Sequence, residues 1–233
     1  MRHLWLAFGT AALGICAPAQ SAGTVAAAGA SNLAAQPIRY VTSAPGPNIL
    51  GTLAEPIRAE RFAASLGRAF ADASTLPAMQ RLIAPARSLN RLQQVDYVQR
   101  AVAQNIRWES DATQWGQHDY WASAAETLAR GAGDMEDRAI VKMQALRALG
   151  FSPSDLFLTL ARDRVGGPIT VLMTRVGGHF LVLDDTGGTP FPVEQRRFEL
   201  QPLLSFGWAG AWVHVRPQTV ASLTPATNGF ARK

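Results

Sequence analysis

The segment 130–137 places acidic groups and a methionine at the start of a predicted helix. Gly131 and Gly133 stop the helix before it, and Asp134 is a good N-cap for the helix that follows. A cysteine directly after such a cap would be a nucleophile, because the exposed N–H groups and the helix dipole stabilise a thiolate. The residue in that place is Met135. A thioether cannot be deprotonated, so this side chain cannot attack a carbonyl carbon.

A base and an orienting acid would complete a site of this kind. His179 opens a predicted strand after a glycine pair, and we expect its ring at the sheet edge that faces the helix. Glu194, on what would be the neighbouring strand, is the candidate carboxylate, with Asp184 or Asp185 as the alternative. A hydrolase in which His179 activates water or a hydroxyl is therefore an alternative function.

The spacing of apolar residues predicts a helical first half and a strand-rich second half. Helices are expected at 57–71, 76–83, 89–108, 124–129 and 134–149. Strands are expected at 156–160, 169–173, 180–183 and 211–215, with hairpins at the glycine pairs 166–167, 177–178 and 187–188. Helices followed by an antiparallel sheet define an α+β domain.

The two ends of the chain differ from this middle part. Residues 1–22 have the three parts of a secretory signal peptide: a charged start, a short apolar run and small residues. A buried N-terminal helix is the alternative. Residues 23–48 are rich in Ala, Gly, Ser and Pro and predict a flexible linker, and 217–233 predict a disordered tail. We therefore expect a folded domain over 49–216 in a periplasmic or secreted protein.

The chain contains one cysteine, Cys16, which lies inside the predicted signal. The mature protein would then have no thiol, which excludes disulfides, thiolate metal sites and thiol redox chemistry. Lipidation of Cys16 is a minor alternative, because Ile15 is a poor residue before a lipidated cysteine. The net charge of +5 comes from arginines scattered among acids. Nucleic acid is therefore not an expected partner.

Four segments of the chain share the pattern of a known enzyme family. They are Gly133-Asp134-Met135-Glu136-Asp137-Arg138-Ala139-Ile140, His179-Phe180-Leu181-Val182, Pro192-Val193-Glu194-Gln195 and Gln114-Trp115-Gly116-Gln117-His118-Asp119-Tyr120-Trp121-Ala122. These segments resemble the bacterial transglutaminase-like cysteine proteinases, the LapG-type periplasmic peptidases. That family has Gly-Asp-Cys-Glu-Asp-Tyr-Ala-Ile, a strand beginning His-x-Val-Leu, then Val-Leu-Asp-Asn, and an upstream Asn-Trp-Gly-x-x-Asp-Tyr-Trp-Ala. The resemblance implies a papain/transglutaminase-like fold, with N-terminal helices packed on an antiparallel β-sheet.

The departures from this family fall at its active site. The resemblance implies that Met135 replaces the nucleophile, that Arg138 replaces a tyrosine, and that Glu194 and Gln195 replace the aspartate and asparagine. His179 is the implied triad residue that remains. Glu194 could still orient an imidazole, although its extra methylene moves the carboxylate. The resemblance thus implies a peptidase fold without a peptidase nucleophile.

The family also implies a metal. The acids beside its nucleophile bind calcium, and Asp134 and Glu136 stand in those places, followed by Asp137. Carboxylate oxygens that lie close together suit Ca²⁺, which takes several oxygen ligands in irregular geometry. The alternative is that Asp134 only caps the helix, while Glu136 and Asp137 favour its positive end.

The leading hypothesis is an exported, inactive homologue that acts by binding a protein or peptide partner. The family activity is calcium-dependent proteolysis of surface adhesins, and the loss of the nucleophile argues against it here. A membrane-anchored receptor of the kind that the family pairs with is one implied partner. A decayed gene product is a third hypothesis, but intact helix caps and glycine turns argue against wholesale decay.

Overall fold

The computed structural model describes residues 46–50, 53–196 and 199–215. The predicted signal at 1–22, the part of the predicted linker at 23–45 and the predicted tail at 217–233 lie outside the described residues. The last residues of that linker are described and pack on the protein. Pro47 is buried, and a Cβ on Gly46 would come within 2.4 Å of the Trp212 ring. The packed domain therefore includes residues that the composition assigns to the linker.

The helices of the described residues precede most of the strands. They are α1 (Ala63–Ala69), α2 (Pro77–Ile83), α3 (Arg91–Asn105), α4 (Asp111–Trp115), α5 (Ala124–Arg130) and α6 (Met135–Ala148). Capping boxes begin α3 and α5: the side chain of Asn90 pairs with Gln93, and that of Ser123 pairs with Glu126. Helix α3 ends earlier than predicted, because Ile106 is extended and leads into a strand.

Seven strands form one antiparallel sheet in the order β1-β9-β8-β4-β5-β6-β7. They are β1 (Leu53–Pro56), β4 (Leu156–Asp163), β5 (Pro168–Val176), β6 (His179–Leu183), β7 (Phe191–Pro192), β8 (Leu200–Gly207) and β9 (Gly210–Val215). A separate parallel pair joins β2 (Arg107–Trp108) to β3 (Ala132–Gly133). Strand β3 leads directly into the cap of α6.

The four predicted strands are present as β4, β5, β6 and β9, and three further strands, β1, β7 and β8, complete the sheet. Strand β8 contains Pro202, which cannot donate a ladder hydrogen bond. Its pairing with β4 shifts at this point, because Leu160 lies opposite Leu204 whereas Ala161 lies opposite Pro202. This irregularity accommodates the proline inside a central strand, which the sequence pattern alone does not predict.

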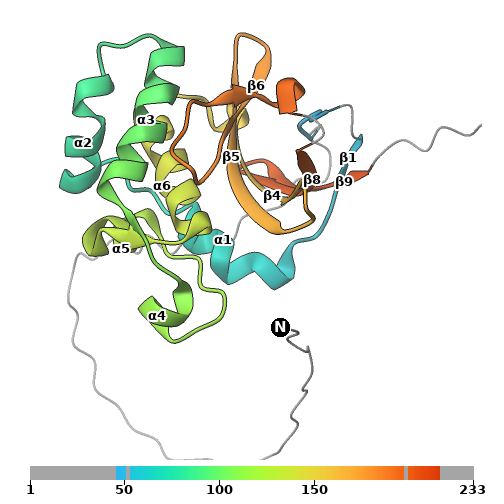
Figure 1. Ribbon diagram of the computed structural model, residues 1–233, viewed down its shortest axis with the longest axis horizontal. Helices are drawn as coiled ribbons and strands as arrows, with labels where there is room; N and C mark the ends of the chain where they lie inside the picture. The colour runs from blue at the N-terminus through green and yellow to red at the C-terminus, as the bar shows by residue number, and fades with distance from the viewer. Residues whose placement is uncertain (1–45, 51–52, 197–198, 216–233) are drawn as a thin grey trace, which may run out of the picture. The chain divides into compact units, whose positions relative to one another are not determined.

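The sheet has a helix-covered face and an outer face. Helices α2, α3, α5 and α6 gather on one side of the sheet (Figure 1). On that side Leu158, Leu172 and Leu183 share a core with Ile140 and Met143 of α6. The outer face carries a second core of alternate strand residues, with Ile49 packed among them: Phe157, Met173, Phe180, Val182 and Trp212.

The fold is the α+β arrangement that the sequence predicts, with helices packed on an antiparallel sheet. Helix α6 is central to it, because it contacts α3 and α5 on one side and β4 and β5 on the other. Nothing in the described part of the chain is both helical and apolar over a length that would cross a bilayer.

Candidate active site and cation site

The start of α6 faces the beginning of β5. The Sδ atom of Met135 accepts a hydrogen bond of 3.3 Å from the backbone N–H of Thr170. The hydroxyl of Thr170 donates to Oε1 of Glu136 over 2.6 Å. Gly133 must be a glycine here, because a Cβ at this position would come within 2.7 Å of the Asp137 Cβ. Met135 is therefore the first residue of α6, directly after the Asp134 cap, as the sequence predicts for the nucleophile position.

His179 does not lie beside Met135, and the prediction that it faces the helix start is wrong. In the β5–β6 hairpin His179 pairs with Val176 at the far end of β5. The six steps from Thr170 to Val176 correspond to roughly 20 Å along the strand. The reason is strand direction: the start of α6 faces the first residues of β5 and therefore the last residues of β6, whereas His179 opens β6.

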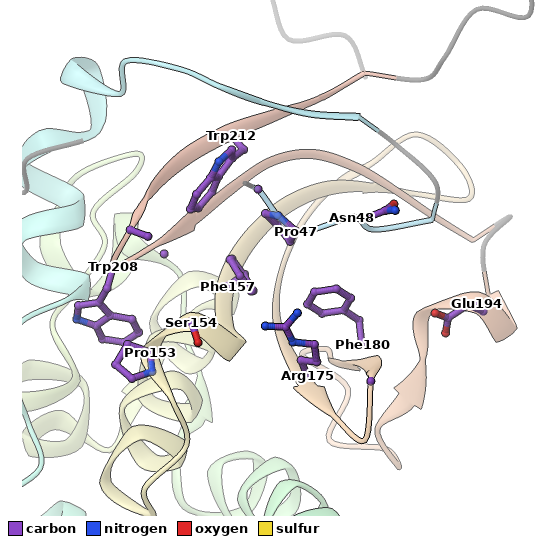
Figure 2. Close-up of a pocket in the computed structure, with 14 residues that line it drawn as sticks. Pro47, Asn48, Pro153, Ser154, Phe157, Arg175, Phe180, Glu194, Trp208 and Trp212 are labelled. Atoms are coloured by element: carbon purple, nitrogen blue, oxygen red, sulfur yellow. The ribbon is translucent and has the colours of Figure 1, made fainter. Parts of the chain in front are cut away.

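Glu194 is also in a different place from the one predicted. It lies on the 3-10 turn η4 (Val193–Arg196), whose Val193 belongs to the outer core. Glu194 lines a cavity of about 600 Å³ on that outer face. Figure 2 shows its carboxylate across the cavity from the rings of Phe157 and Trp212. The sheet therefore separates Glu194 from the start of α6, and Glu194 cannot orient a base there.

The acids that do lie beside α6 are Asp184 and Asp185, the alternative left open by the sequence. The side-chain amide of Gln99 donates to both Oδ1 and the carbonyl of Asp184, at 3.1 Å each, and the ammonium of Lys142 donates to the same carbonyl. Arg138 Nη1 lies 2.7 Å from Oδ1 of Asp185. The end of β6 is therefore held to the helical layer by two cations and an amide.

This geometry indicates that two motifs of the family correspond to residues other than those assigned to them from the sequence. Val-Leu-Asp-Asn fits 182–185 in three of four positions, with Asp185 in place of the asparagine. The Val-Leu of His-x-Val-Leu fits Val171-Leu172 on β5, which puts Ile169 in the histidine's place, directly before Thr170. Neither of these two residues is a base. The positions that correspond to nucleophile and base thus hold a thioether and an uncharged side chain.

Burial of the charged groups beneath this site changes their acidity. Lys142 is 1% exposed, and its burial lowers the pKa of the ammonium to about 8, against the opposing effect of Asp185. Burial raises the pKa of Asp185, which the charge of Arg138 opposes. Arg138 is 7% exposed. These charges are mutually compensating, which is the condition under which buried ions are tolerated.

A cluster of three carboxylates lies at the other side of the helix start. Asp111, Asp134 and Asp137 each bring one oxygen to within 4.8 Å of the others. Burial is the main cause that raises the pKa of Asp134 to about 8 and that of Asp137 to about 7, and the neighbouring carboxylates add to it. Burial also raises the pKa of Asp111. Such repulsion between buried acids is relieved when a cation binds.

The free oxygens of this cluster fit a cation. Asp111 Oδ2 accepts from the N–H of Tyr120 at 2.6 Å, and Asp137 Oδ1 accepts from the N–H of Ala122 at 2.7 Å. Within the described residues, the second oxygens, Asp111 Oδ1 and Asp137 Oδ2, are buried without a hydrogen-bond partner. Hard oxygens oriented in this way suit Ca²⁺.

The cluster differs from the pair expected from the sequence. Asp134 belongs to it, but Glu136 accepts from Thr170 and faces β5 instead. Asp111 is the residue that the sequence reasoning missed. It opens the short helix α4, well before the motif, and its carboxylate reaches the cap of α6 only because the loop after α4 folds back through Tyr120.

Helices packed on an antiparallel sheet in this way define a papain/transglutaminase-like fold. The chain belongs to the bacterial transglutaminase-like cysteine proteinases, whose family model matches residues 72–219.

Two solved structures of a relative match it. Calcium-bound LapG of Legionella pneumophila is 28% identical, with a TM-score of 0.52, over 63% of this chain and 82% of LapG. The EGTA-treated form of the same protein is 27% identical, with a TM-score of 0.52, over 60% of this chain and 75% of LapG. No curated protein sequence matches the chain.

Proposed function

We propose that this protein is an exported, catalytically inactive member of its family, which acts by binding a protein or peptide partner. The observation that carries this proposal is the contact between Met135 Sδ and the N–H of Thr170. A cysteine peptidase needs a thiolate and an imidazole at this contact. Here the helix contributes a thioether, and β5 contributes Thr170, whose hydroxyl is not a base.

The pattern of what is retained supports binding rather than decay. The cap of α6, the close-packed Gly133 and the three-acid cluster are all intact although catalysis no longer needs them. Buried like charges are costly and would be lost in a chain without a use for them. A periplasmic or secreted location, and a membrane-anchored receptor as one partner, remain part of this proposal on the strength of the predicted signal.

A calcium ion at Asp111, Asp134 and Asp137 is the second part of the proposal. When bound, the ion would supply positive charge that neutralises the three carboxylates. Asp111 belongs to the α4 segment and the other two to the start of α6, so these residues would join the two segments around the ion. That LapG has been solved both calcium-bound and EGTA-treated supports this assignment.

Two measurements test the proposal. The purified mature protein, incubated with calcium and a panel of peptides, should release no new termini by mass spectrometry. Cleavage that disappears in Thr170→Val or Met135→Ala would overturn the assignment as inactive.

Calorimetric titration with CaCl₂ should show binding that Asp111→Asn and Asp137→Asn each abolish. The control is Asp96→Asn, which removes the same charge from a half-buried residue of α3 that pairs with Arg100. Equal calcium binding by the wild type and all three variants would show that these aspartates do not form the calcium site.

A further inference from the structure

Trp108 is unusually exposed for a tryptophan. Its side chain is 57% accessible. The other large apolar residues of the described chain with such exposure are aliphatic: Leu92, Val165 and Val215. Contact between an apolar indole ring and water is unfavourable in the isolated protein. Tryptophan is among the residues that contribute most to binding when a partner covers them. Trp108 is therefore a candidate contact residue.

The backbone of β2 offers hydrogen bonds on the same surface. Arg107 N–H donates to the Gly131 carbonyl at 3.0 Å, and Glu109 N–H donates to the Gly133 carbonyl at 3.2 Å. In a parallel ladder, alternate residues point their N–H and C=O groups to opposite sides. The N–H and C=O of Trp108 therefore point away from β3. Among the described strands, β3 is the one neighbour of β2, so this edge is unpaired.

The edge lies close to the altered active site. Trp108 pairs with Gly133, two residues before Met135. Neighbouring strands are about 4.8 Å apart, so a chain added to β2 would run roughly 10 Å from β3, the strand that leads into α6. The charges of the edge balance, because the Arg107 guanidinium lies 2.8 Å from Glu109. Recognition here would depend on backbone hydrogen bonds and apolar contact rather than on net charge.

We propose that β2 binds an extended segment of the partner protein by strand addition, with a large apolar side chain packed on the indole of Trp108. This inference rests on the proposed function, since it names where and in what conformation the partner binds. Strand addition takes its affinity from main-chain hydrogen bonds and its specificity from alternate side chains. An unpaired edge beside an exposed aromatic ring supplies both.

The experiment selects linear nine-residue peptides from a display library against the mature protein with calcium and measures their affinities by fluorescence polarisation. Trp108→Ala should weaken the selected peptides by about tenfold or more. Leu92→Ala is the matched control, because Leu92 is 59% exposed on α3, and it should leave affinity unchanged. Among single N-methylations along a peptide, the one at the amide that donates to the Trp108 carbonyl should weaken binding most, because only alternate amides face a neighbouring strand and β2 is two residues long.

The outcomes separate this inference from the proposed function. Selected peptides that bind Trp108→Ala as well as the wild type, or that tolerate every N-methylation, would overturn the edge-strand site while leaving a peptide-binding protein. A library that yields no binder to the wild type would count against both. Both variants should melt at the wild-type temperature, because the two side chains are exposed.

Discussion

Arg138 of α6 and Asp185 at the end of β6 form an ion pair, with Nη1 and Oδ1 2.7 Å apart. Both residues depart from the family pattern, which has a tyrosine and an asparagine in their places once Val-Leu-Asp-Asn is aligned with 182–185. Without Asp185, the buried Arg138 would lose its ion-pair partner, and without Arg138, Asp185 would keep only the charge of Lys142 near it. Together they attach the end of β6 to the helix that carries Met135, so the two departures compensate each other.

The first prediction concerns this pair. Arg138→Tyr should lower the free energy of unfolding by about 2 kcal/mol, because it leaves a carboxylate without its partner. This is below the about 3–5 kcal/mol of a fully buried pair, since the Asp185 side chain is 30% exposed. The double variant with Asp185→Asn should recover at least half of that loss. Urea denaturation of the two single variants and the double variant measures the coupling; additive losses would show that the charges do not depend on each other.

The second prediction concerns the nucleophile position. In Met135→Cys the new thiol should react with iodoacetamide at about pH 6 no faster than an ordinary cysteine, because no imidazole stabilises the thiolate and acids flank it. Adding Thr170→His places a base on the residue that contacts position 135 and should accelerate the reaction. The control adds His179→Ala to Met135→Cys, which should change nothing. An effect of His179 would contradict the separation of these residues in the hairpin.

The third prediction concerns the acidic cluster without metal. The pKa values of Asp134 and Asp137, about 8 and about 7, lie above the ordinary 3.8. Between these limits the folded state binds more protons than the unfolded chain, so stability is lost as pH rises. In EGTA the melting temperature should therefore be lower at pH 8 than at pH 5. Calcium should raise it mainly at pH 8, and Asp111→Asn should remove that increase. A calcium effect of equal size at both pH values would contradict this linkage.

The fourth prediction concerns His214 on β9. Its Nε2 lies 2.8 Å from the hydroxyl of Ser205, and burial lowers its pKa to about 4, from 6.5. The unfolded chain then binds the proton more readily, so stability is present above about pH 6.5 and is lost as pH falls towards 4. Chemical denaturation at pH 6.5 and pH 4.5 should show a smaller loss in His214→Gln than in the wild type. His118→Gln, at an exposed loop position, should retain the full loss.

Much of the fold followed from local sequence. The Asp134 cap and the hairpins at the glycine pairs depend on residues a few positions apart, and the structure contains all of them. The α+β order and the family pattern were likewise readable from the sequence. Strand β8 was not, because a proline in a central strand is tolerated only where the ladder of the finished sheet shifts.

The sequence by itself also determined the central chemical fact, that a methionine follows the Asp134 cap. Only the tertiary structure decided what surrounds it. Which end of a strand faces a helix depends on the direction and order of strands in the whole sheet, and this placed Thr170 beside Met135 and His179 at the opposite end of the hairpin. Asp111 joined the acidic cluster for a similar reason, since the chain between α4 and α6 folds back on itself.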